Sequence, residues 1–291
     1  LYLQYWWLYA FITSVFAAIY YTINQYANLP GYTLVFWRGF IPLITLTPLL
    51  FFLEWPNNHT FYIATITTSL IVTYTDARVL QGVAIFGGGV SLRMKPFSVW
   101  LIFLLWFCTH ADHRNDLLSD PLKFICILMT LCVGAYAASN LRKCNISNKA
   151  FFYFLPIILS SALIDVLNKT AMDHSGLMSG VIIYAWIQAL IISVFTAAHH
   201  VINKNLLVKD IFNSKTVLTG IFLGLCVVVM NISKNIAMSY TVNPAYVTAI
   251  VFIAPFWVSL FYKITKYEEE ADVRSGAILV LSSIALVLLN R

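Results

Sequence analysis

Long apolar runs follow one another along the whole length of this chain, and they limit what it can fold into. Of its 291 residues, 60% are hydrophobic and 10% are charged, whereas soluble domains carry about 25% charged residues. A helix needs roughly 20 apolar residues to cross a bilayer, and several runs reach that length. The runs are continuous and do not alternate in polarity, so they predict membrane-spanning helices rather than the strands of a barrel.

Ten such spans can be drawn, and they leave no room for a soluble domain. The connections between them are short and hold most of the charged and turn-forming residues. The expected fold is an all-α polytopic membrane protein with ten transmembrane helices. The spans cover approximately residues 5–24, 32–53, 60–79, 82–107, 122–140, 150–169, 177–198, 216–234, 243–262 and 275–289.

The fourth span carries charge near its middle. Arg93, Lys95 and Pro96 lie between two apolar runs, 82–92 and 97–107, and neither run alone is long enough to cross a bilayer. A charge near the bilayer centre costs about 2.5–3.5 kcal/mol on insertion scales, so such residues commonly serve a site or a pathway. Either this segment is a loop between two half-spans, or it lies inside one long helix.

Weak matches in the same order relate the two halves of the chain. Lys95-Pro96-Phe97 in the fourth span is similar to Ala254-Pro255-Phe256 in the ninth. Five spans per half is an odd number, so the halves, 1–145 and 146–291, are expected to be inverted repeats. Pro255 lies inside an apolar run that contains no charged residue. This match favours placing the charged residues of the fourth span within the membrane.

This pattern resembles the EamA-type drug/metabolite transporter superfamily, whose members carry two five-helix repeats. The similar features are Trp37-Arg38 in the second span, Pro96 and Pro255, and the acidic turn Glu268–Glu270 before the last span. The resemblance implies a secondary-type transporter that moves a small polar metabolite, an amino acid or a related solute, by alternating access. It leaves the identity of the solute open.

Charged and polar residues inside the predicted spans are candidates for binding the solute. Arg93 and Lys95 are two residues apart, about 200° around a helix, so both cannot face one cavity. The basic bias favours a solute with a carboxylate or a phosphate. The candidate binding residues are Arg38, Arg93, Lys95, Trp100, Tyr184, Gln188 and Trp257.

Acidic residues in the spans are candidates for coupling or for structural ion pairs. Asp165 and Lys169 are four residues apart in the sixth span, a spacing that suits an ion pair along a helix. Asp165 is also a candidate for proton coupling. Asp76 lies near the end of the third span. The alternative to a binding role for Arg93 and Lys95 is structural pairing with Asp76 or Asp165.

The two prolines of the matched spans are expected at bends. Pro96 and Pro255 each remove one backbone hydrogen bond from a helix and can kink it. In a carrier such kinks serve as hinges or expose backbone oxygens to the solute. A static kink without any role in transport is the alternative.

One polar loop has a composition that suits metal binding. His110, Asp112, His113 and Asp116 lie between the fourth and fifth spans, but their spacing matches no zinc motif. The five cysteines show no CxxC spacing. We therefore expect no metal, no cofactor and no catalytic residue. The alternatives to a carrier are a membrane-embedded enzyme, for which this loop is the only cluster, and a non-transporting membrane subunit.

Charge and composition also bear on partners and location. The formal net charge of +6 lies in short connections and not in a basic patch, so nucleic acid is not an expected partner. The expected partners are the lipid bilayer, a small-molecule solute, and a proton or counter-solute. We expect a monomer or homodimer in a bacterial cytoplasmic (inner) membrane. With both ends in the cytoplasm, more loop cations fall outside than inside, so the orientation stays open.

Overall fold

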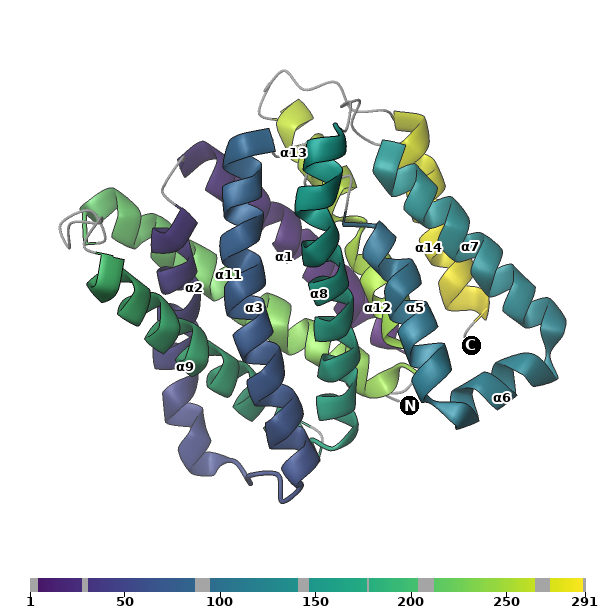
Figure 1. Ribbon diagram of the computed structural model, residues 1–291, viewed down its shortest axis with the longest axis horizontal. Coiled ribbons are helices and arrows are strands. Elements are labelled where there is room, and N and C mark those ends of the chain that lie inside the picture. The colour runs from purple at the N-terminus through teal and green to yellow at the C-terminus, as the bar shows by residue number, and fades with distance from the viewer. Residues whose placement is uncertain are drawn as a thin grey trace.

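The computed structural model describes residues 5–27, 31–86, 95–140, 147–176, 178–203, 212–264 and 273–289. Over these residues the fold is all-α (Figure 1). Six helices are long and apolar enough to cross a membrane, and three further apolar helical stretches are shorter. The all-α fold and the membrane-spanning helices expected from the apolar runs are confirmed, and the chain is an integral membrane protein.

Neighbouring helices run in alternating directions through one bundle (Figure 1). Helix α1 begins and α14 ends at the same end of this bundle, where the short helix α6 also lies. In chain order the elements are α1 (Trp6–Ala27), α2 (Gly31–Leu46), the 3-10 helix η2 (Thr47–Phe52), α3 (His59–Phe86), α5 (Phe97–Thr109), α6 (Ala111–Ser119), α7 (Pro121–Asn140), α8 (Asn148–Asp173), α9 (Met178–Asn203), α11 (Ser214–Tyr240), α12 (Pro244–Val251), α13 (Ala254–Ile264) and α14 (Val273–Leu289).

The most extensive helix contacts join segments that are far apart in the sequence. Helix α1 packs on α11, α2 on α9 and α3 on α8. Each of these pairs joins the first half of the chain to the second, so the two halves share one core. The predicted boundary between the halves, at residues 145 and 146, lies outside the described residues.

Two predicted spans are interrupted at a proline. The sequence predicts one helix over 82–107, but α3 extends to Phe86 and α5 begins only after Pro96. A proline is tolerated at a helix start because no donor is needed there. The ninth span divides in the same way, since α12 ends at Val251. In a continuous helix the ring of Pro255 would clash with the carbonyl of that residue, four positions earlier.

Two glycines allow α11 to approach α2 closely. A Cβ atom on Gly220 would overlap the ring of Trp37, and a Cβ atom on Gly224 would overlap the side chain of Ile41. Trp37 is 4% exposed, so it has little room to move away. Membrane helices have no hydrophobic driving force between them, and small residues at their contacts let the backbones pack closely. This contact places α2, and with it Arg38, against the second half of the chain.

We expect Gly224→Leu to destabilise the protein by about 1–3 kcal/mol, because overpacking a tight contact forces side chains and backbone to shift. Thermal unfolding of the purified protein in detergent measures this loss as a lower Tm. The control is Leu225→Ile, an apolar change at the adjacent, 45% exposed position. Equal Tm values for both variants and the unmodified protein would contradict this packing.

Candidate functional site

A cavity of about 220 Å³ lies in the interior of the bundle. Helices α1, α2, α3, α8, α11 and α12, together with the starts of α5 and α13, contribute to its walls. Its charged lining residues are Arg38, Asp76, Lys95, Asp165 and Lys234, and its hydroxyl-bearing aliphatic residues are Thr13, Thr75, Ser98, Ser161 and Thr248. Four of the five charged residues are among those that the sequence singled out.

Arg38 and Asp76 form an ion pair between α2 and α3. Arg38 Nη1 contacts Asp76 Oδ2, and the two side chains are 22% and 21% exposed. Because Trp37 packs against α11, the next residue, about 100° further around the helix, turns toward the cavity. The Nε atom of Arg38 is buried and has no hydrogen-bond partner among the described residues. The guanidinium therefore retains a donor that its carboxylate partner does not use.

Asp165 joins three helices at the cavity wall. Lys234 Nζ, on α11, lies 2.5 Å from Asp165 Oδ1, and Thr248 Oγ1, on α12, donates to Asp165 Oδ2 at 2.6 Å. Both carboxylate oxygens are thus engaged, by a cation and by a hydroxyl. An ion pair that is largely removed from water needs such additional hydrogen bonds to offset the loss of solvation.

The expected ion pair between Asp165 and Lys169 does not form. Lys169 instead pairs with Asp173, one turn further along α8, and its ammonium lies 5.9 Å from the ring centroid of Trp106. The i,i+4 spacing predicted that Lys169 pairs along α8. It does, but its partner is Asp173 and not Asp165. Asp165 faces the cavity, where Lys234 reaches it from another helix.

Lys95 differs from the other two cavity cations because its partner is neutral. Its Nζ donates to the hydroxyl of Tyr21 at 2.8 Å and lies 5.1 Å from the centroid of that ring. Among the described residues no carboxylate pairs with Lys95. The structural pairing with Asp76 or Asp165 considered from the sequence is not what the structure shows, because both acids are paired with other cations. The lining residues that the structure describes carry three cations and two carboxylates, a formal charge of +1.

Gln188 and Tyr184 lie behind the cavity wall rather than in it. Both are buried and belong to one chain of polar contacts. Tyr184 bonds to Asn168, Gln188 Nε2 donates to the Tyr184 hydroxyl at 3.4 Å, and Asn231 Nδ2 donates to Gln188 Oε1 at 3.0 Å. Only Asn231 lines the cavity. The predicted binding residue Gln188 thus supports a neighbour that reaches the site.

The two predicted tryptophans pack in the core and do not line the cavity. Trp257 Nε1 donates to Ser14 Oγ at 3.1 Å, and its ring meets Phe11 edge to face, with centroids 5.4 Å apart. Trp100 is partly buried and packs against the main hydrophobic core. Arg93 lies outside the described residues.

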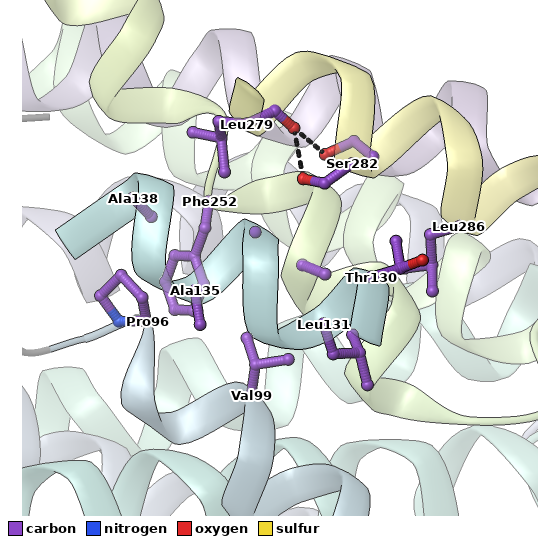
Figure 2. Close-up of a pocket in the computed structure, with 13 residues that line it drawn as sticks. Pro96, Val99, Thr130, Leu131, Ala135, Ala138, Phe252, Leu279, Ser282 and Leu286 are labelled. Atoms are coloured by element: carbon purple, nitrogen blue, oxygen red, sulfur yellow. Dashed lines mark hydrogen bonds between the residues drawn. The ribbon is translucent and has the colours of Figure 1, made fainter. Parts of the chain in front are cut away.

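The two prolines belong to different cavities. Pro255, at the start of α13, lines the charged cavity. Pro96 lies at the edge of a second pocket of about 20 Å³, between α5, α7 and α14 (Figure 2). The hydroxyls of Ser282 and Ser283 donate to the carbonyl of Leu279 at 2.9 Å, so α14 satisfies them internally. This pocket holds about one water molecule and is too small for a solute.

Lys234 and Tyr21 are cavity residues that the sequence did not indicate. Lys234 falls at the predicted end of the eighth span, where cations commonly reach the membrane surface. The helix α11 continues to Tyr240, so Lys234 lies inside it. The apolar residues Ile236–Met238 were a signal that the span runs on. Tyr21 is one of 16 tyrosines, and nothing in its neighbourhood distinguishes it from the others.

The histidines of the polar loop are engaged in other contacts. His113 is buried on α6 and contacts Asn243, while His110 stacks on Trp106 with ring centroids 3.4 Å apart. Within the described chain, no group of three or more His, Cys, Asp or Glu side chains is arranged to hold a metal ion.

Comparison with known proteins relates this chain to others by fold alone. No protein-family model matches the sequence, and no curated protein sequence matches it. A solved structure described only as "Crystal structure of protein" superposes with a TM-score of 0.72 and 12% sequence identity, over 99% of this chain and 95% of that chain. At this identity the likeness shows a shared fold, so the chain is a helical membrane protein with a structural homologue of unnamed function.

Coupling between Asp165 and Lys234 can be measured with a double-mutant cycle. We expect Asp165→Asn and Lys234→Met each to lower the Tm. The double variant should lose less free energy of unfolding than the two single variants together, by about 0.5–3 kcal/mol. The reason is that either single change leaves an uncompensated group. Lys169→Met is the matched control and should combine additively with Asp165→Asn. Additivity at 165 and 234, or coupling at 165 and 169, would contradict this pairing.

Proposed function

We propose that this protein is a secondary-type carrier that moves a small polar solute across a membrane by alternating access. The solute carries a carboxylate or a phosphate. The observation that supports this most is the interior cavity, whose lining has a net positive charge and includes Lys95, a cation without a carboxylate partner in the described part of the chain.

The size and the charge of the cavity both suit a hydrated solute site. Liquid water occupies about 30 Å³ per molecule, so 220 Å³ corresponds to roughly seven water molecules or one small metabolite. Charged groups among membrane helices are costly, and they usually pair with one another or face a water-filled pathway. Ion pairs with a purely structural role need neither an open space beside them nor an additional cation.

The path of the chain supports two inverted five-helix halves of the EamA type. The alternating helix directions, and the placement of the start of α1 and the end of α14 at one end of the bundle, suit an even number of crossings such as ten (Figure 1). In this arrangement α12 and α13 together form one crossing, and α5 belongs to another. The first half supplies Arg38, Asp76 and Lys95 to the cavity, and the second half supplies Asp165 and Lys234. A site shared between inverted halves is a common plan of secondary transporters.

Asp165 is the residue that we propose for coupling to protons. Its carboxylate contacts Lys234 and Thr248 on two other helices. Protonation would weaken the ion pair and free α11 to move relative to α8. Bound anionic solute would compensate the cation that is released. The alternative roles, a membrane-embedded enzyme or a non-transporting subunit, have less support. The charged groups converge on the cavity, whereas His110 and His113 lie apart from it.

Lys95 is the residue whose loss should affect an anionic solute most. Hydrogen bonds to charged groups contribute about 1.5–3 kcal/mol, so we expect Lys95→Gln to reduce uptake of the transported anion about 10–100-fold. Lys95→Arg should retain more activity. The measurement is uptake of labelled carboxylates, phosphates and amines by proteoliposomes. Lys149→Gln, at an exposed position in the first turn of α8, is the control.

The outcomes of this experiment separate the parts of the proposal. Uptake limited to cationic amines, or anion uptake unaffected by Lys95→Gln, would overturn the proposed solute class and the role of Lys95. Absence of uptake for every solute class, with a folded and correctly inserted protein, would count against a carrier.

A further inference from the structure

A buried histidine on α6 meets the residue that caps α12. His113 Nε2 and Asn243 Nδ2 are 3.0 Å apart, and the two residues are 7% and 0% exposed. His113 lies in the connection between α5 and α7, and Asn243 directly precedes α12. This contact joins two elements that are 130 residues apart in the sequence.

The direction of this hydrogen bond is determined by the helix cap. Asn243 Oδ1 accepts a hydrogen bond from the backbone N–H of Ala245 at 2.9 Å, so the amide nitrogen of Asn243 faces His113. An amide nitrogen only donates, and Nε2 of the imidazole must therefore accept. Nε2 accepts only in the neutral imidazole that carries its proton on Nδ1. A second proton on His113 would place two N–H donors against each other.

In the described part of the chain, the charged groups near His113 come mainly from its own helix, where Asp112, Arg114 and Asp116 lie close to it in the sequence. Burial lowers the pKa of His113; Asp116 on the same helix raises it, and His110 lowers it. Helices α5 and α12 carry no charged side chain, and α7 carries a single cation, Lys123. The segment that leads into α12, Thr241–Asn243, is also uncharged. Among the residues that the structure describes in Thr241–Asn243 and α12, no acidic side chain is available to compensate a positive charge on the imidazole.

This contact lies at the end of the bundle away from Lys95. Helix α5 begins beside the cavity at Lys95 and ends where α6 begins (Figure 1). Between the two lies a layer of aromatic rings, in which Phe103 stacks near Phe124 and Tyr246 with centroids 6.4 and 6.5 Å away. These rings belong to the hydrophobic core that α5, α7 and α12 share, and Leu117 of α6 belongs to the same core.

We propose that His113 is a proton-binding site that controls closure of the bundle at the α6 end. Neutral His113 holds the first turn of α12 against α6, and a proton on His113 breaks the contact and releases that turn. Helix α12 also carries Thr248, which bonds to Asp165 in the cavity, so the release reaches the charged site. The effect on transport rests on the proposed carrier function, whereas the proton-linked release does not.

The direction of the pH dependence of stability follows from the neutral imidazole of His113 in the closed structure. The closed structure binds the proton less tightly than the open or unfolded chain, so the contact is at full strength above the ordinary histidine pKa of about 6.5. It weakens as the pH falls below that value. Acid therefore favours the opened α6 end.

The test is the Tm of the purified protein in detergent, measured from pH 8 to pH 5. We expect the Tm to fall through His113 as the pH drops, because burial lowers the pKa of His113 in the closed structure and the unfolded chain therefore binds the proton more tightly. His113→Gln should remove this part of the pH dependence. His59→Gln, which removes an exposed histidine at the start of α3, should not.

Asn243→Asp should reverse the direction in which the Tm changes with pH. Aspartate caps a helix as well as asparagine does, but it presents an acceptor with a negative charge to His113. The Tm of this variant should rise as the pH falls through the histidine range. Should His113→Gln fail to fold, Asn243→Ser keeps the cap and removes the donor, and it should flatten the pH dependence.

Two results would overturn the proposal. One is a His113→Gln variant, or its Asn243→Ser substitute, that keeps the pH dependence of the unmodified protein. The other is an Asn243→Asp variant whose Tm falls with acid in the same way as that of the unmodified protein. Neither result bears on uptake by proteoliposomes, so the proton site and the carrier function are tested separately.

Discussion

A charge among membrane helices needs an opposite charge, a polar partner or water, and the interior of this protein is organised by that requirement. Asp76 and Asp165 each meet a cation from another helix. These two pairs hold α2 against α3 and α8 against α11 around one space. Lys95 has a phenol as its partner, so its charge is only partly compensated by the protein. In the carrier that we propose, water or an anionic solute in the cavity would complete the solvation of this ammonium.

Charge in an apolar run was a reliable signal, and it led to Arg38, Lys95 and Asp165 because such residues are rare there. The signal did not extend to Lys234, whose position looked like the end of a span. Uncharged candidates were harder to assign from the sequence. Gln188 and Trp257 are residue types that occur both in binding sites and in packed cores. Which side of a helix faces a cavity depends on tertiary packing, and one sequence does not contain that information.

Helix ends at prolines account for the other difference from the sequence prediction. The matched Pro96 and Pro255 suggested kinks inside long helices, whereas both lie where a helix begins. The 8-residue helix α12 is the short piece that results. It contacts His113 through Asn243 at one end of the bundle and contributes Thr248 to the cavity, so a single element links both places.

Reactivity at Ser98 tests the central claim most directly. Ser98 is 2% exposed and lines the cavity, so Ser98→Cys in a background without the five native cysteines reports on water in the cavity. Membrane-impermeant thiol reagents are added to either side of sealed vesicles. We expect labelling from both sides, with the anionic reagent favoured over the cationic one relative to their rates with a free thiol. An unreactive thiol, or labelling from one side only, would contradict an alternating-access site.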